Sequence, residues 1–264
     1  MKVAVVQIAY ADGEPLADRR ERAAGLVRAQ AGADLVLLPE LWAPTGFGYR
    51  GWAAAAEPLD GPTVAAIAKA ARSIGSVVHA GSIIEALPEP GPEGKVLANT
   101  SVLLGPDGSR LAVYRKIHRF GFAEGEPSLL EAGREIVVVD LPGGGPRVGL
   151  STCYDLRFPE LYRAQVDRGA QVFLVPAAWP RPRVAHWSLL GRARAVENQC
   201  VLVAANTGGT HAGYVMGGAS QVVSPRGDVL AEAGGGAEIL TVEVDLGEVT
   251  AYRREFPVLA DRRL

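Results

Sequence analysis

Short β-rich runs alternate with longer helical stretches along most of this chain, and this alternation limits the possible folds more than any other feature. Strands are predicted at residues 2–8, 34–38, 76–84, 171–176 and 201–206, with a last strand group at 219–244. Helices are predicted near residues 15–31, 61–74, 158–168 and 185–199. The pattern predicts an α/β fold in which helices lie outside the sheets.

Residues 100–150 follow a different pattern. The apolar runs TSVLLG, LAVYR, EIVVVDL and RVGLST are separated by the turn sequences PDG and LPGGGP, which predicts consecutive, largely antiparallel strands. All Gly/Pro-rich segments are turn-sized, so we predict one domain over residues 1–264. The longest of them, residues 85–95, is interpreted as a mobile surface loop without function.

Composition narrows the class of partner. The chain of 264 residues is 48% hydrophobic, and its formal charge of -2 is spread without long single-sign runs. It therefore carries no basic footprint for nucleic acid or membrane, and we expect a small-molecule partner. The apolar run KVAVVQI after Met1 is too short for a signal peptide or a membrane span, which predicts a cytoplasmic protein. Without CxxC or HExxH spacing, no metal or other cofactor is predicted.

The two cysteines, both predicted to be free thiols, have different surroundings. Cys153 follows the run RVGLST and precedes FPELYRAQ, so it would lie near a helix N-terminus, which lowers thiol pKa. Charged residues flank it, whereas Cys200 has only Gln199 as a polar neighbour and fits a small buried hydrophobe. At this point catalytic and structural roles for Cys153 are about equally supported.

Two further charged residues follow predicted strands. Glu40 comes after LVLLP, and ligands gather at the carboxyl ends of strands in α/β sheets, although a Glu here could also cap a turn. Lys116 is one of only four lysines against 23 arginines, and it stands between two arginines in VYRKIHRFGF. A compact ammonium suits a developing oxyanion, while a solvated basic strand end is the alternative.

A histidine could also serve as the general base for a cysteine nucleophile. His79 lies inside an apolar strand and is predicted to be core, and His211 in GGTHAGY is predicted to be exposed. His118 and His186 lie near predicted strand ends, where they could line a pocket. None of the four is decisive by itself.

Taken together, PELW, YRKIHRFGF and CYDLRFPELYR resemble the nitrilase (carbon-nitrogen hydrolase) superfamily. KVAVVQI, LANTSVLL and AHWSLLGRARAVENQ extend the resemblance over nearly the whole chain. It implies a four-layer α-β-β-α sandwich, a homodimer across the helical face beside the nucleophile or a higher homo-oligomer, and a Glu-Lys-Cys triad without cofactor.

The resemblance also implies residue roles. Cys153 would be the nucleophile and Glu40 the general base, while Lys116 and the backbone N–H of Tyr154 would hold the oxyanion. These roles make the histidines unnecessary. Many members have a second glutamate between the lysine and the cysteine, for which GFAEGEPSLLEAG offers Glu126 with Glu124 as the alternative.

The branch that these motifs resemble contains omega-amidases and deaminated-glutathione amidases, which implies a small dicarboxylate monoamide such as 2-oxoglutaramate as substrate. A distal carboxylate would need a cation, for which Arg181 and Arg183 are the candidates. Arg157 is another, unless it forms a structural ion pair with Asp155. The aromatic residues expected to wall the pocket, each with core packing as the alternative, are Trp42, Phe47, Tyr154 and Trp179.

The sequence alone leaves other functions open. The nearest alternative is an N-carbamoyl amino acid amidohydrolase of the same superfamily, and a nitrile substrate is less expected. From other classes, the alternatives are a non-catalytic binding module and a cysteine hydrolase that uses an Asp in place of Glu40.

Overall fold

The strands form two six-stranded sheets and a small third sheet in the computed structural model, which describes residues 1–122 and 124–263. Across the first sheet lie β15 (Glu238–Glu243), β1 (Lys2–Gln7), β3 (Leu35–Leu37), β4 (Val77–Ala86), β5 (Leu97–Leu104) and β6 (Arg110–Arg115). Across the second lie β14 (Val229–Glu232), β13 (Gln221–Val223), β10 (Val201–Ala205), β9 (Val172–Pro176), β8 (Arg147–Leu150) and β7 (Val138–Asp140). The third sheet contains β12 (Tyr214–Val215), β11 (Gly208–His211) and β2 (Ala9–Tyr10).

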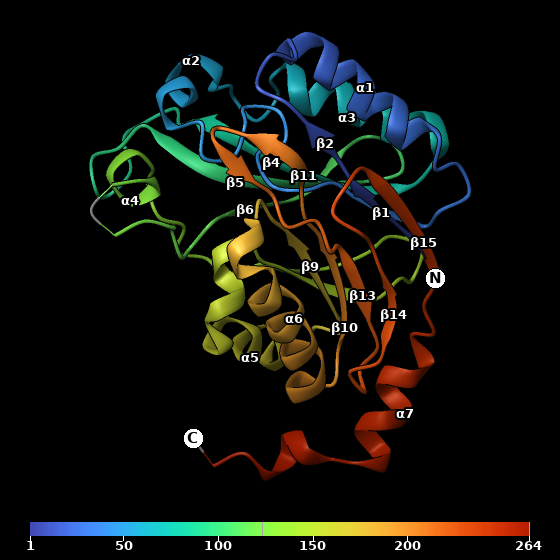
Figure 1. The fold of residues 1–264 in the computed structure, drawn as a ribbon. Helices are drawn as coiled ribbons and strands as arrows, with labels where there is room; N and C mark the ends of the chain where they lie inside the picture. The colour runs from blue at the N-terminus through green and yellow to red at the C-terminus, as the bar shows by residue number, and fades with distance from the viewer. Residues whose placement is uncertain (123, 264) are drawn as a thin grey trace.

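Helices α1 and α3 cover the outer face of the first sheet, and α5 and α6 cover that of the second (Figure 1). The α-helices are α1 (Leu16–Arg28), α2 (Trp52–Ala55), α3 (Pro62–Ile74), α4 (Glu126–Leu129), α5 (Pro159–Asp167), α6 (Val184–Asn198) and α7 (Gly247–Glu255). The 3-10 helices are η1 (Tyr49–Gly51), η2 (Cys153–Arg157), η3 (Arg181–Arg183) and η4 (Val258–Asp261). None of the helices in the described part of the chain has the length and apolar character that a bilayer crossing requires.

Strand alternation produces four layers. In β1, Val3 and Val5 pack with residues of the second sheet, while the intervening Ala4 packs with residues of α1 and α3. In β9, Leu174 faces the first sheet, and Phe173 packs with residues of α5 and α6. Strands with both faces buried read as continuous apolar runs, as the sequence does here. The predicted four-layer α-β-β-α sandwich is confirmed.

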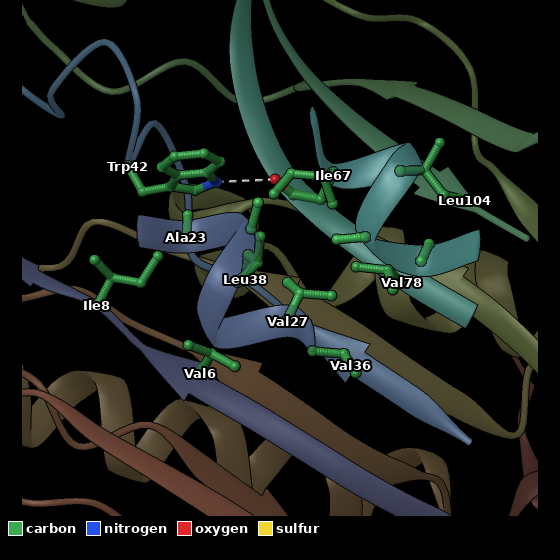
Figure 2. Packing of buried hydrophobic residues seen from close by; sticks show 14 of the residues in the cluster. Val6, Ile8, Ala23, Val27, Val36, Leu38, Trp42, Ile67, Val78 and Leu104 are labelled. Carbon is green, nitrogen blue, oxygen red and sulfur yellow. Dashed lines mark hydrogen bonds between the residues drawn. The ribbon is translucent and has the colours of Figure 1, made fainter. Parts of the chain in front are cut away.

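The outer core beneath α1 and α3 contains a residue that we expected elsewhere. Trp42 is fully buried there, beside Ala23 and Ile67, and its Nε1 donates a hydrogen bond to the Ala80 carbonyl at 2.9 Å (Figure 2). The prediction that Trp42 walls the pocket is wrong, because its ring faces the helix layer.

The middle of the chain also departs from the prediction. β5 pairs antiparallel with β6, and β7 pairs antiparallel with β8, but β6 and β7 are edge strands of different sheets. Residues 116–137 cross from one sheet to the other, so the apolar runs of residues 100–150 do not form one antiparallel series. This crossing segment carries Lys116 and Glu126.

The predicted loop at residues 85–95 begins with the last two residues of β4 and then runs over the surface. Its backbone is held by Glu131, whose carboxylate accepts hydrogen bonds from the N–H groups of Glu93 (3.0 Å) and Lys95 (3.3 Å). The loop is therefore tied to the segment that follows α4.

Candidate active site

The ends of three strands bring Glu40, Lys116 and Cys153 to one pocket. Glu40 follows β3 and Lys116 follows β6, both in the first sheet, while Cys153 follows β8 in the second. The Glu40 N–H also donates to the Ala177 carbonyl at 3.3 Å, which joins the end of β3 to the end of β9. The predicted gathering of polar side chains at strand ends is therefore found between the two sheets.

Lys116 bridges two buried carboxylates. Its Nζ is 2.8 Å from Glu40 Oε1 and 2.8 Å from Glu126 Oε2, and all three side chains are nearly inaccessible to solvent. Burial alone would lower the pKa of Lys116, but the charges of Glu126 and Glu40 outweigh it and raise that pKa well above its usual range. The lysine is thus a permanent cation at the base of the pocket.

Glu126 and Glu124 are the two candidates for the second glutamate that the resemblance implies. Glu126 begins α4 and lines the pocket, whereas Glu124 is exposed and is absent from the pocket wall. The Phe120 N–H donates to its Oε2 at 2.5 Å, and Lys116 is 3.0 Å from its Oε1. Burial raises the pKa of Glu126, and the charge of Lys116 opposes that rise.

Asn99 is a site residue that the sequence reasoning did not single out. It lies on β5, is buried, and donates hydrogen bonds from Nδ2 to Oε1 of both Glu40 and Glu126, each at 2.8 Å. A buried amide within the apolar run LANTSVLL was the signal that could have identified it.

The two carboxylates differ in what remains free. Glu126 Oε1 accepts hydrogen bonds from Lys116 and Asn99, while Oε2 accepts from the Phe120 amide and lies 2.8 Å from Lys116 Nζ as an ion pair. Glu40 Oε1 accepts from Asn99 and Lys116, whereas Oε2 accepts from the Ala178 N–H at 2.8 Å. A carboxylate oxygen has two in-plane lone pairs, so Glu40 Oε2 retains acceptor capacity toward the cavity.

Cys153 sits at the start of η2 with a backbone φ of 50°, the left-handed region that non-glycine residues seldom adopt. Asp155, fully buried, stabilises this turn by accepting hydrogen bonds from the Thr152 N–H (2.8 Å), the Tyr114 hydroxyl (2.6 Å) and the His118 N–H (2.9 Å). Because Tyr114 and His118 flank Lys116 in sequence, Asp155 connects the cysteine turn to the lysine segment.

The prediction of a lowered pKa at Cys153 is wrong. Burial raises the pKa of the thiol well above its usual range, and the negative charge of Glu40 adds to the rise. The helix that starts at Cys153 is a 3-10 helix of only five residues. A protonated thiol therefore faces the carboxylate.

Aromatic side chains form most of the remaining pocket wall. Of those predicted, Phe47, Tyr154 and Trp179 line it. Three further aromatic residues that the sequence did not single out also line it, namely Tyr49, Trp52 and Phe120. The Phe47 ring lies 5.9 Å from Phe120 and 4.7 Å from Tyr214 at the β11–β12 hairpin.

Two of the three candidate arginines reach the pocket. Arg183 lines it, with its guanidinium 5.4 Å from the Phe120 ring centroid, and Arg157 lines it with its guanidinium 4.7 Å from that of Trp179. Within residues 1–122 and 124–263, neither arginine forms an ion pair with a carboxylate. Arg181, on the same 3-10 helix as Arg183, is exposed and does not line the pocket.

The proposed ion pair of Arg157 with Asp155 is not formed, because Asp155 faces Tyr114 and His118 instead. The histidines lie outside the described pocket wall. His79 is core, as predicted, and burial lowers its pKa to about 3. The prediction that His211 is exposed is wrong: β11 pairs with β2, which buries His211 against the Tyr10 ring at 4.1 Å.

Among the described residues, no three His, Cys, Asp or Glu side chains are grouped so that they could hold a metal ion. The described pocket thus combines a thiol, a carboxylate with a free lone pair, a paired ammonium and two guanidiniums without carboxylate partners. A carbonyl carbon next to Cys153 could be attacked by sulfur while its oxygen faces Lys116.

Comparison with known proteins gives concordant matches. Residues 2–254 match the family model described as carbon-nitrogen hydrolase. A 2-oxoglutaramate amidase from Paenarthrobacter nicotinovorans is 43% identical, covering 100% of this chain and 90% of the relative. An omega-amidase from Homo sapiens is 35% identical over 93% of this chain and 90% of the relative.

Solved structures agree with these sequence matches. A carbon-nitrogen hydrolase superfamily protein from Xanthomonas campestris, with an arsenic adduct in its active site, superposes with a TM-score of 0.88 and 31% identity, covering 100% of this chain and 97% of that one. A mutant amidase from Nesterenkonia sp. AN1, which shows the result of Michael addition of acrylamide at the active-site cysteine, superposes with a TM-score of 0.77 and 28% identity, covering 98% of each chain.

Proposed function

The chain belongs to the carbon-nitrogen hydrolase family and acts on amides, and we propose that it hydrolyses a small dicarboxylate monoamide such as 2-oxoglutaramate through a thioester on Cys153. The observation that carries the substrate proposal is the pair of pocket guanidiniums, Arg157 and Arg183, with no carboxylate partner in the described chain. The names of two relatives, 2-oxoglutaramate amidase and omega-amidase, support it.

In the first half-reaction, Glu40 Oε2 takes the proton of the Cys153 thiol as the sulfur attacks the amide carbon. The tetrahedral oxyanion accepts hydrogen bonds from the Lys116 ammonium and from the backbone N–H of Tyr154 near the start of η2. Glu40 returns its proton to the amide nitrogen, and the C–N bond breaks. Ammonia departs, and a thioester remains on Cys153.

In the second half-reaction, Glu40 takes a proton from a water molecule, which attacks the thioester carbon. The oxyanion again forms beside Lys116 and collapses with loss of the Cys153 sulfur, which recovers the proton from Glu40. Glu126 does not act as a base in this scheme, because its oxygens are occupied by the Lys116, Asn99 and Phe120 donors. Its charge instead stabilises the ammonium.

Arg183 and Arg157 would bind the distal carboxylate of the substrate. A guanidinium forms bidentate hydrogen bonds with a carboxylate, and stacking on Phe120 and Trp179 would restrict the two side chains before binding. A neutral amide of similar length would lose this interaction but keep the chemistry at Cys153.

The test compares ammonia release from 2-oxoglutaramate with release from neutral butyramide. Arg183→Gln is expected to lower kcat/KM for 2-oxoglutaramate by about 100-fold, the order of one charge-assisted pair, and to leave butyramide turnover nearly unchanged. Arg181→Gln is the matched control, since Arg181 belongs to the same 3-10 helix but is exposed and does not line the pocket.

An equal loss on both substrates, or no loss in Arg183→Gln and Arg157→Gln, would overturn the carboxylate assignment. Wild-type turnover of N-carbamoyl amino acids but not of 2-oxoglutaramate would favour the alternative substrate class. That result would leave the thioester chemistry intact.

Two predictions concern the protein as a whole. We propose a homodimer formed across the face of α5 and α6, where the exposed Leu189 and Val196 on α6 support an apolar contact. Light scattering on the purified chain measures the oligomeric state.

A cytoplasmic location stays a prediction, which fractionation of the source cells would test.

A further inference from the structure

Asn99 contributes to the site without lining the pocket. It is only 2% exposed, and its Nδ2 donates to Oε1 of Glu40 and Oε1 of Glu126, each at 2.8 Å. Its Oδ1 is buried without a hydrogen-bond partner in the described part of the chain. The amide therefore uses both of its N–H donors on carboxylates and leaves its own acceptor unpaired, which is a costly arrangement for a buried group.

Strand register determines this placement. Along β5, Asn99 faces the carboxylates, while the next residue, Thr100, points to the opposite face and donates to Glu85 Oε2 at 2.7 Å. The Asn99 carbonyl also accepts a hydrogen bond from the Lys116 N–H at 2.9 Å. Asn99 thus positions the main chain of the lysine as well as the two carboxylates.

Two buried carboxylates that share one lysine repel each other, and one lysine supplies only a single positive charge. An amide can bridge two anions without adding charge. An ammonium has three N–H groups, so sharing the bridging between Lys116 and Asn99 leaves donor capacity on Lys116 for a substrate oxygen. With its Oε1 occupied, Glu40 presents only Oε2 to Cys153.

We propose that Asn99 is a positioning residue that bridges Glu40 and Glu126 and directs the free oxygen of Glu40 toward Cys153. This inference rests on the function proposed above. A donor that bonds to a carboxylate stabilises its charged form, so loss of the donor raises the carboxylate pKa. The acid limb of the pH dependence of kcat/KM, which reports the free base, would then move to higher pH.

The other groups that face these carboxylates are Lys116, Cys153, Tyr10 and Tyr49. Burial raises the pKa of Tyr49 to about 12 and raises that of Tyr10 further, so both hydroxyls stay neutral across the assay range. The lysine stays charged in that range for the reasons given above. A shift of the acid limb in an Asn99 variant therefore reports on the two glutamates.

The experiment measures kcat, KM and the pH profile for 2-oxoglutaramate, and for butyramide if the former is not turned over. Asn99→Leu removes both donors at similar volume and is expected to lower kcat about 10- to 100-fold, with little change in KM and an acid limb about one pH unit higher. Asn99→Asp keeps the packing but adds an acid between two carboxylates, and it is expected to move the acid limb of the pH profile to still higher pH. This second variant keeps the test informative if Asn99→Leu does not fold.

Thr100→Val is the matched control, because Thr100 is the buried neighbour on β5 and also donates to a buried carboxylate, but away from the site. It is expected to lower the melting temperature while keeping the wild-type pH profile. Folded Asn99 variants with the wild-type acid limb, or a limb that moves equally in Thr100→Val, would overturn the assignment of Asn99. Failure of the wild-type protein to turn over either amide would instead count against the proposed function.

Discussion

Cys153 and Cys200 are both buried in the same core cluster beneath α5 and α6, yet only one faces a pocket. The Cys200 sulfur lies 3.3 Å from the carbonyl oxygens of both Ala170 and Asn198, which share its single S–H donor, and it accepts from Arg253 Nη2 at 3.0 Å. Burial raises the pKa of Cys200 to about 12, just as burial raises that of Cys153. The two cysteines therefore differ neither in being buried nor in the direction of their pKa shift. They differ because a carboxylate with a free lone pair, that of Glu40, faces Cys153.

The largest expected effect is on turnover. Cys153→Ala is expected to lower kcat by at least about 10⁴-fold, because the covalent route is lost, whereas Cys200→Ala should keep kcat within about twofold of wild type. Ammonia release from a common amide measures both variants. Equal losses in the two variants would show that the contrast between the cysteines is not chemical.

Glu40→Gln separates thiol acidity from catalysis. The charge of Glu40 raises the pKa of Cys153, so its removal beside Lys116 should lower that pKa, while loss of the base lowers amide turnover by about 10²- to 10⁴-fold. In a Cys200→Ala background, the pH dependence of iodoacetamide alkylation, followed by intact mass, reports on Cys153 alone. In Glu40→Gln, the midpoint of the alkylation curve should lie at lower pH than with Glu40 present, although amide turnover is lower.

Glu124→Gln is the control for this experiment, since Glu124 is an exposed carboxylate on the segment preceding α4. It should change neither the alkylation midpoint nor turnover. If the midpoint in Glu40→Gln moved to higher pH, Glu40 would not be the group that destabilises the Cys153 thiolate.

The smallest expected effect is on stability and belongs to Cys200. Its folded pKa of about 12 lies above the unfolded value of about 8.5, so its contribution is complete below pH 8.5 and is lost as pH rises toward 12. Cys200→Ala should cost about 1–2 kcal/mol at pH 7 through lost packing and hydrogen bonds, and this deficit should disappear at pH 10, where the wild type has lost about 2 kcal/mol that the variant keeps. Urea unfolding at both pH values measures it, and an unchanged deficit would contradict the raised pKa.

Much of the fold follows from local pattern. The predicted helices near 15–31, 61–74, 158–168 and 185–199 correspond to α1, α3, α5 and α6, because each stretch is followed closely by a Gly or by the next strand. The apolar runs at residues 2–8, 34–38, 171–176 and 201–206 likewise predicted the central strands β1, β3, β9 and β10 of the two large sheets. The pairing of the strands in residues 100–150 could not be predicted in this way, since antiparallel hairpins look alike whether they belong to one sheet or two.

The sequence by itself determined the α/β class, the strand ends that carry Glu40, Lys116 and Cys153, and the family that these motifs resemble. Only the tertiary structure brought Asn99 to two carboxylates, chose Glu126 over Glu124 beside Lys116, placed Arg183 but not Arg181 on the pocket wall, and buried His211. It also reversed the expected pKa shift of Cys153. The physical reason is that desolvation and charge act through space, so they depend on which segments enclose a side chain and not on its neighbours along the chain.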